Sequence, residues 1–201
     1  MTEQIRDSVR HKKAEYYILT QSADSLFMPK EHGLALCFSG STACYNGYYC
    51  EYIIVDGQLF LQNLFTHANT YPALNGVNAT IAYEEYYEYR MGQKEKVKVE
   101  SEFREYRDLN IPIHYTGILL LGKDFNRDTY MRYNKLIELK FVEGKLIEET
   151  DESEWAKRMK DSLINLDETS LKRLGYGTIF NGIKPINKID GNAIIGDFAA
   201  T

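Results

Sequence analysis

The chain has 201 residues, of which 44% are hydrophobic and 26% charged, and it contains only four prolines. This composition is typical of a soluble globular protein and argues against extended disorder, so we expect a single domain over residues 1–201. The formal net charge is −5. Because an acidic surface repels phosphate backbones, we expect no nucleic-acid binding. The lysines of residues 92–100 alternate with glutamates and indicate a solvated hairpin tip rather than a basic patch.

The sequence also predicts where the protein resides. Residues 1–17 lack the apolar core of a secretory signal, and the longest apolar run, Ile118 to Leu121, is far too short to span a bilayer. We therefore expect a cytoplasmic protein without a membrane partner. The three cysteines, Cys37, Cys44 and Cys50, are an odd number in a reducing compartment, so we expect free thiols.

The first third of the chain predicts one short helix followed by strands. Residues 3–13 have apolar side chains four apart, which favours an amphipathic helix. Residues 14–21 are rich in β-formers and predict a strand, and the segment from Pro29 to Gly33 breaks the chain. Residues 34–41 form a short apolar run that ends in small polar residues, which predicts a strand and then a turn.

Two hairpins have the same turn chemistry. Residues 51–60 and 138–147 both contain Val, an acid, Gly, one residue and Leu, and an acid-Gly pair supplies the positive φ of a two-residue turn. The first hairpin, residues 48–65, is apolar on both faces and is predicted to be central. The second, around Glu143 and Gly144, has one polar face and is predicted to lie nearer an edge. Hairpin chemistry explains the match without a duplication.

The segments between these two hairpins predict a loop and further strands. Residues 66–80 are rich in Asn and Gly and predict a loop. We interpret residues 81–106 as a hairpin that turns near Gly92, although the first half also fits a helix. Residues 111–125 predict a strand, apolar on both faces, that ends at Gly122.

The character of the chain changes after residue 150. Asp151 and Glu154 have capping-box spacing, and apolar residues at helical intervals follow, so residues 151–175 predict one or two helices. The tail, residues 176–201, is Gly-rich but apolar, and we expect it to pack on the body or on a partner subunit. The predicted fold class is α+β: a largely antiparallel sheet over about residues 15–149, with C-terminal helices packed against it.

Several kinds of chemistry are disfavoured. Residues 117–124 match a phosphate-binding loop, G-x-x-x-x-G-K, but the intervening residues belong in a strand, and Asp124 replaces the hydroxyl that binds Mg²⁺. The histidine and cysteine spacings fit no structural zinc site, so we predict no metal and no cofactor. A Cys–His pair for nucleophilic catalysis could be formed by Cys44 or Cys50 with His67 or His114. No G-x-S-x-G motif or papain-like sequence surrounds these residues, so we predict no catalytic residue.

Tyrosine is the most unusual component, with 16 residues. Tyr combines an apolar body with a hydrogen-bonding tip, which suits protein interfaces and ligand pockets, although it is also a good strand residue. A cluster of charged residues beyond the predicted end of the 111–125 strand is a second candidate. The candidate binding residues are Tyr45, Tyr48, Tyr49, Tyr83, Tyr86, Tyr87, Lys123, Asp124, Arg127 and Asp128.

Two functions of different class follow. The first is a non-enzymatic protein–protein interaction module of the immunity, inhibitor or accessory type, because acidic surfaces complement basic partners. The alternative is a binder or hydrolase of a small, nucleotide-like ligand, with a pocket lined by tyrosines and the Lys123–Asp128 segment. A homo-oligomer formed through the C-terminal tail is a further expectation.

Overall fold

The computed structural model describes residues 5–22, 25–37, 43–90, 93–126, 133–155 and 157, and nearly all of them belong to strands or to the turns and loops between strands. The ten strands are β1 (Ser8–His11), β2 (Ala14–Gln21), β3 (Tyr48–Val55), β4 (Gln58–Thr66), β5 (Thr80–Arg90), β6 (Gln93–Tyr106), β7 (Ile111–Pro112), β8 (Gly117–Phe125), β9 (Tyr133–Val142) and β10 (Lys145–Asp151). A 3₁₀ turn, η1 (Pro29–His32), lies between β2 and β3.

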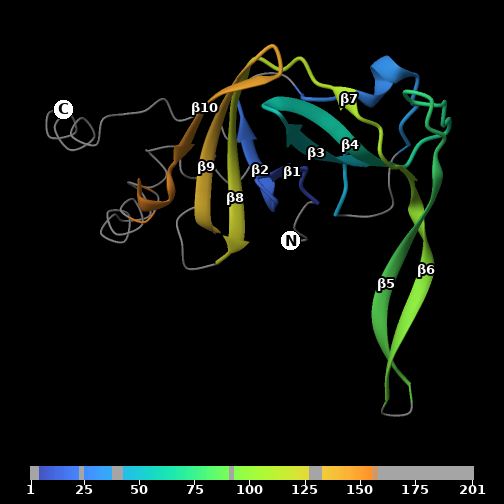
Figure 1. Ribbon diagram of the computed structural model, residues 1–201. Helices are drawn as coiled ribbons and strands as arrows, with labels where there is room; N and C mark the ends of the chain where they lie inside the picture. The colour runs from blue at the N-terminus through green and yellow to red at the C-terminus, as the bar shows by residue number, and fades with distance from the viewer. Residues whose placement is uncertain are drawn as a thin grey trace, which may run out of the picture.

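All ten strands join in one mixed sheet that closes on itself. Their order is β10-β9-β8-β2-β1-β3-β4-β6-β5, with β7 beside β4. The β1–β3 pair is parallel and the other pairs are antiparallel. Lys145 of β10 also pairs with Gln58 of β4. This contact joins β10, at one end of the strand order, to β4, so the strands from β10 to β4 form a barrel-like ring and β6 and β5 continue beyond it (Figure 1).

The two acid-Gly turns meet at the closure. The N–H of Leu59 donates to the Gly144 carbonyl at 2.9 Å, and the N–H of Leu146 donates to the Gly57 carbonyl at 2.7 Å. Gly144 has φ +77°, and a Cβ there would overlap the carbonyl oxygen of Ile113. The glycine therefore supplies both the left-handed turn and the close approach of backbones that closure requires.

The inner face of the closed sheet forms one apolar core. Every strand of the ring except β10 contributes buried members, which include Val9, Tyr16, Tyr52, Leu59, Leu61, Leu119, Leu121, Leu139 and Phe141. Loop residues such as Leu34 and Leu109 complete the cluster. Leu146 of β10 packs on the margin of this cluster. The interior is thus filled by side chains.

The predicted α+β class is wrong. The described residues are almost entirely β, and their helical content is η1 and the residues 153–155 and 157. The carboxylate of Asp151 accepts the N–H of Ser153 at 3.0 Å, as a capping side chain does. Trp155 then packs near Tyr133 and Leu136 on the barrel. The remaining residues of the predicted helices, and the tail 176–201, lie outside the described residues.

The N-terminal helix predicted over residues 3–13 is also wrong. Ser8–His11 is a strand that pairs with β2 and β3, and Val9 is fully buried. Its hairpin to β2 turns at Lys12 and Lys13, which both have positive φ (49° and 65°). An apolar spacing of four fits a short strand as well as a helix, so the neighbouring strands decided the outcome. Of the predicted 34–41 strand, Leu36 makes an isolated bridge to Ala68; residues 38–41 are not described.

The other hairpins are confirmed. In β3–β4, Val55 pairs with Gln58 and Tyr52 with Leu61 across the Asp56-Gly57 turn, and the pair is central in the sheet. β5 and β6 are both strands, and Arg90 pairs with Gln93 across the turn. β10 ends the strand order as predicted, apart from its closing contact to β4. Residues 67–79 form the expected loop between β4 and β5.

The predicted strand 111–125 is divided and does not end at Gly122. Residues 113–116 separate β7 from β8, and β8 continues to Phe125. A Cβ on Gly122 would meet the ring of Tyr133 at 2.7 Å. The glycine therefore makes room for an aromatic ring on the neighbouring strand instead of ending its own strand. Residues 117–124 all lie in β8, as the rejection of a phosphate-binding loop required.

Candidate functional site

The most distinctive feature of the molecule is a two-stranded arm. We use this name for residues 83–100, the part of the β5–β6 hairpin between the Tyr83–Glu100 pair and the turn. β6 pairs with the barrel only near its end, where Arg104 to Tyr106 lie beside β4. The arm therefore projects away from the barrel as an isolated ribbon (Figure 1). A two-stranded hairpin alone is marginally stable in water, so a long projecting arm is unusual without a partner.

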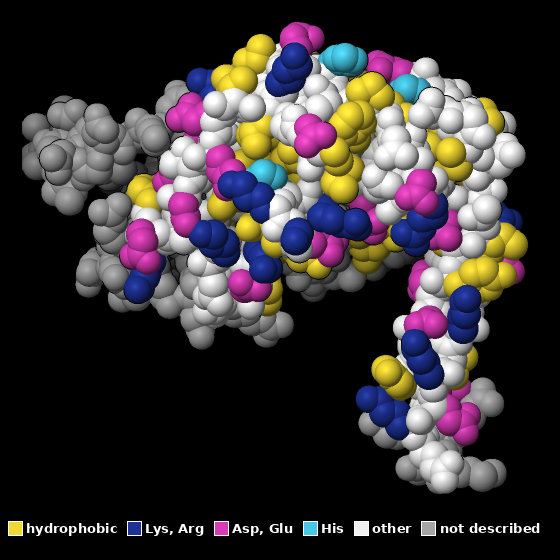
Figure 2. Space-filling view, in the orientation of Figure 1, with side chains coloured by type: hydrophobic (Ala, Val, Ile, Leu, Met, Phe, Trp, Pro, Cys, Tyr) yellow, Lys and Arg dark blue, Asp and Glu magenta, His cyan; other side chains and the backbone are white. Residues whose placement is uncertain are grey.

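Three predicted binding residues lie on the arm and are exposed. The exposed fractions are 53% for Tyr83, 46% for Tyr86 and 58% for Tyr87. Tyr83 and Tyr87 point to one face and Tyr86 to the other, because side chains alternate along a strand. Apolar, basic and acidic side chains are all visible along the projecting arm (Figure 2).

One face of the arm pairs tyrosines with lysines. The amine of Lys94 lies 4.1 Å from the ring centre of Tyr87, and the amine of Lys98 lies 4.4 Å from that of Tyr83. Both distances are typical of cation–π contacts. Lys96 forms an ion pair with Glu85 at 2.5 Å, and this pair holds the pKa of the Glu85 carboxyl below its usual value. The lysines of this face thus have partners within the arm.

The opposite face is acidic and apolar. Across the two strands, Glu84 pairs with Val99, Tyr86 with Val97, and Glu88 with Glu95. The carboxylate of Glu84 accepts a hydrogen bond from the Ser101 hydroxyl at 2.6 Å.

Tyr49, another candidate binding residue, packs against other rings at the base of the arm. Its ring stacks on Phe65 with centroids 4.5 Å apart and meets the edge of Phe103 at 5.8 Å. With Cys44 and Ala82 these rings form a small apolar cluster at the base of the arm, which we call the anchor cluster. The tyrosine clusters in the sequence therefore contain both a packed residue, Tyr49, and exposed residues. The alternation of side chains along a strand does not distinguish the two kinds.

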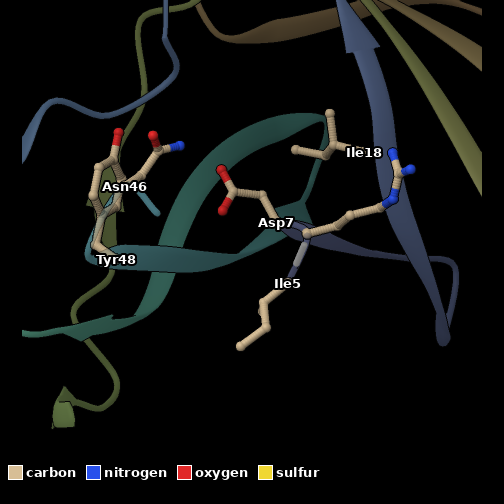
Figure 3. A pocket seen from close by; sticks show the side chains of 6 residues that line it. Ile5, Asp7, Ile18, Asn46 and Tyr48 are labelled. Carbon is tan, nitrogen blue, oxygen red and sulfur yellow. The ribbon is translucent and has the colours of Figure 1, made fainter. Parts of the chain in front are cut away.

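Tyr48 lies at a small cavity beside the parallel β1–β3 pair. The cavity holds about 170 Å³ and is lined by Ile5, Arg6, Asp7, Ile18, Asn46 and Tyr48. The Asp7 carboxylate points across it toward Asn46 and Tyr48 (Figure 3). The Tyr48 hydroxyl donates to the Phe27 carbonyl at 3.4 Å, and burial raises its pKa to about 12. Tyr45 is 59% exposed in the turn just before β3.

Asp7 links β1 to β3. Its Oδ1 accepts the N–H of Cys50 at 2.8 Å, and its carbonyl accepts the N–H of Ile18 at 2.8 Å. Burial raises the pKa of Asp7 from its usual 3.8 to about 6, and the bond from Cys50 acts in the opposite direction. A carboxyl at this position thus keeps its proton into mildly acidic pH, which sequence reasoning missed because no pattern marks Asp7.

A larger hollow lies between two segments, residues 25–32 and 111–116. It holds about 450 Å³, and its wall includes Phe27, His32, Ile113 and His114. The imidazole of His32 stacks on Phe27 with centroids 4.6 Å apart. Its volume is within the range of small-molecule sites. None of the predicted binding residues lines this hollow.

The predicted charged cluster is not in a loop. Lys123 and Asp124 lie within β8, and Asp124 has φ 60°. Arg127 and Asp128 lie outside the described residues. The tyrosines and the Lys123 segment are on separate elements, and neither residue of this segment lines the two cavities described above.

The buried thiols have the wrong electrostatics for a nucleophile. All three cysteines are free. Burial raises the pKa of Cys44 and of Cys50, whereas a reactive cysteine needs a lowered pKa. The Nδ1 atom of His67 is buried without a hydrogen bond, 4.0 Å from a carboxylate oxygen of Glu102. In the part of the chain that the structure describes, no three His, Cys, Asp or Glu residues are grouped to hold a metal.

Comparison of the chain with protein-family models, with curated proteins and with solved structures found no match. Among the described residues, no helix has the length and apolar character needed to cross a membrane.

Proposed function

We propose that this chain is a non-enzymatic protein–protein interaction module and that the arm is its binding element. The observation that carries the proposal is the isolation of the arm, which contacts the barrel at its base and exposes Tyr83, Tyr86 and Tyr87. Tyrosine is enriched at interfaces because a large contact area is gained for little lost side-chain entropy. An immunity, inhibitor or accessory role in the cytoplasm agrees with the net charge of −5.

The arm can be tested separately from the barrel. A variant in which residues 84–99 are replaced by Asn-Gly keeps the Tyr83–Glu100 pair and the anchor cluster. We expect it to fold with the circular dichroism of a β protein and to lose the stoichiometric partner that the full chain captures from its native host.

Point variants refine this test. We expect the triple replacement of Tyr83, Tyr86 and Tyr87 by Ala to weaken capture as the arm deletion does. Replacement of Tyr17, which is 44% exposed on β2 of the barrel, is the matched control and is expected to leave capture unchanged. Capture that survives deletion of the arm, or no stoichiometric partner with the full chain, would overturn the proposal.

The hollow between residues 25–32 and 111–116 supports a second candidate function, the binding of a small molecule. Its volume of about 450 Å³ and the imidazoles of His32 and His114 are the observations in favour. Because a ligand of the native state raises apparent stability, screening nucleotides and metabolites by thermal shift tests this candidate. A ligand of this site should lose its effect when Ile113 is replaced by Trp, and no stabilisation by any compound at millimolar concentration would reject it.

A further inference from the structure

The half-buried carboxyl of Asp7 has one oxygen without a partner. Its Oδ1 accepts the N–H of Cys50 at 2.8 Å, whereas its Oδ2 has no hydrogen bond in the part of the chain that the structure describes. Asp7 also forms no ion pair with any described residue. A carboxylate that is partly removed from water without a cation beside it has a desolvation cost. The position therefore favours a partner with positive charge.

Further hydrogen-bond acceptors border the cavity that Asp7 faces. The Asp7 carboxylate points across it toward Asn46 and Tyr48 (Figure 3). The side chain of Asn46 has no hydrogen bond to a described residue, so its carbonyl oxygen is an open acceptor. The Tyr48 hydroxyl donates its proton to the Phe27 carbonyl, which leaves its oxygen lone pairs as acceptors. Three acceptors thus border one cavity.

The size and the walls of the cavity restrict the kind of cation. Its volume of about 170 Å³ is below the roughly 300–1,000 Å³ of sites for drug-sized ligands, so the ligand is small. A calcium ion prefers about six to eight oxygen ligands, and among the described residues no three His, Cys, Asp or Glu are grouped. A primary ammonium group donates three hydrogen bonds, which matches the three acceptors. Ile5 and Ile18 add apolar walls for an alkyl chain.

We propose that this cavity binds a primary ammonium group carried on a short alkyl chain. The ammonium donates one hydrogen bond to Oδ2 of Asp7 and the other two to the oxygens of Asn46 and Tyr48. The alkyl chain packs against Ile5 and Ile18. A free amine and the side chain of a lysine share this chemistry. The site is separate from the arm and does not depend on the proposed function of the arm.

The other titratable groups around Asp7 keep the same charge between pH 5 and 8. Burial raises the pKa of the thiols of Cys44 and Cys50 and of the hydroxyls of Tyr48 and Tyr52, so all four stay neutral. Arg6 lines the cavity, is exposed and stays charged. Its charge opposes a second cation, so we expect a dissociation constant of roughly 1 mM or more. The pH dependence of binding then reports the ionisation of Asp7.

Titration of the full chain with n-butylammonium chloride, followed by NMR, tests the proposal. Sodium chloride is withdrawn as the amine is added, so that the ionic strength is constant, and n-butanol is the neutral control. The amides of Cys50 and Ile18, which both donate to Asp7, are the reporters. We expect saturable shifts with the amine and none with the alcohol. Binding should be about tenfold weaker at pH 5 than at pH 7, because about a tenth of the Asp7 carboxyls are ionised at pH 5.

Four variants locate the contact. Asp7→Asn keeps an acceptor for the N–H of Cys50 but removes the charge, and it should weaken binding at least tenfold. Glu15→Gln makes the same change in net charge at an exposed residue of β2 outside the cavity and should have no effect. Asn46→Ala should weaken binding by about threefold or more through one lost hydrogen bond. Arg6→Gln should strengthen it at least twofold, because a like charge is removed.

Three outcomes would overturn the proposal: equal shifts with butanol, an unchanged titration in Asp7→Asn, and no saturable shift at 100 mM butylammonium. A weaker site in Glu15→Gln than in Asn46→Ala would do so too, because it would indicate a general attraction of cations to the acidic chain. Nα-acetyl-lysine methylamide distinguishes the two sources of the amine. Tighter binding of this compound than of butylammonium would assign the site to a lysine of a protein, and weaker binding to a free amine; both support the proposal.

Discussion

The half-buried carboxyl of Asp7 makes the stability of the protein depend on pH in a predictable direction. Its pKa is 3.8 in an ordinary setting and about 6 in the folded chain. Between these values the folded state holds the proton that the unfolded state has lost. Because the native state then binds more protons, the contribution of Asp7 to the free energy of unfolding falls as pH rises from about 4 to about 6 and is constant above that window.

The magnitude follows from the same two values. Each pH unit of separation corresponds to about 1.4 kcal/mol, so the separation between 3.8 and about 6 gives a loss of about 3 kcal/mol. Asp7→Asn keeps an oxygen to accept the N–H of Cys50 but has no proton to lose. We expect the variant to match the wild type at pH 4 and to be more stable by about 3 kcal/mol at pH 7.

Urea unfolding at pH 4, 5, 6 and 7 measures both proteins under matched salt. Asp7→Ala is the control, because it removes the acceptor of the Cys50 N–H. We expect it to be less stable than Asp7→Asn by about 1–3 kcal/mol at every pH. A constant difference between wild type and Asp7→Asn across the range would refute the reasoning, and so would a less stable Asn variant at pH 7.

Three other predictions concern closure, the arm base and the thiols. Gly144→Ala should destabilise the fold by about 3 kcal/mol or more, because its Cβ would overlap a backbone carbonyl. Gly57 has the same φ of +77° but open space around it, so Gly57→Ala should cost about 1 kcal/mol. Equal losses of stability in urea unfolding would show that the backbones are not closely packed at Gly144. Tyr49→Ala should cost about 2 kcal/mol through its lost stack on the anchor cluster, and Tyr83→Ala less than about 1 kcal/mol, compared by thermal melting. In native protein, Cys37 should react with a thiol reagent before the two buried cysteines; mass spectrometry showing simultaneous labelling would contradict this.

The hairpins were predictable from the sequence because their determinants are local. An acid-Gly pair between β-formers sets the turn and also the register, so the pairing of Val55 with Gln58 follows without knowledge of other strands. The Lys12-Lys13 turn has the same geometry but no glycine to mark it, which is why β1 resembled the start of a helix. Strand 111–125 was misread for a related reason, since Gly122 marks a close contact with Tyr133 and not a chain break.

The candidate site was only partly predictable. Tyrosine clusters identify strands that carry amphipathic rings, but exposure depends on what lies beside each strand. Tyr49 faces Phe65 and Phe103 and is an anchor, whereas Tyr83 and Tyr87 belong to a segment beyond the reach of the barrel. The isolation of the arm follows from strand lengths and from where β6 leaves β4, which no local pattern specifies.

The sequence by itself determined the β-hairpins, their turns and the alternation of side chains, because these depend on neighbours a few residues away. Only the tertiary structure decided that the sheet closes into a barrel, since closure brings Gly57 and Gly144 together from distant parts of the chain. It also decided that Asp7 is half-buried and that the arm stands apart from the barrel. Burial and projection are properties of the assembled sheet, and they depend on long-range packing that the sequence pattern does not encode locally.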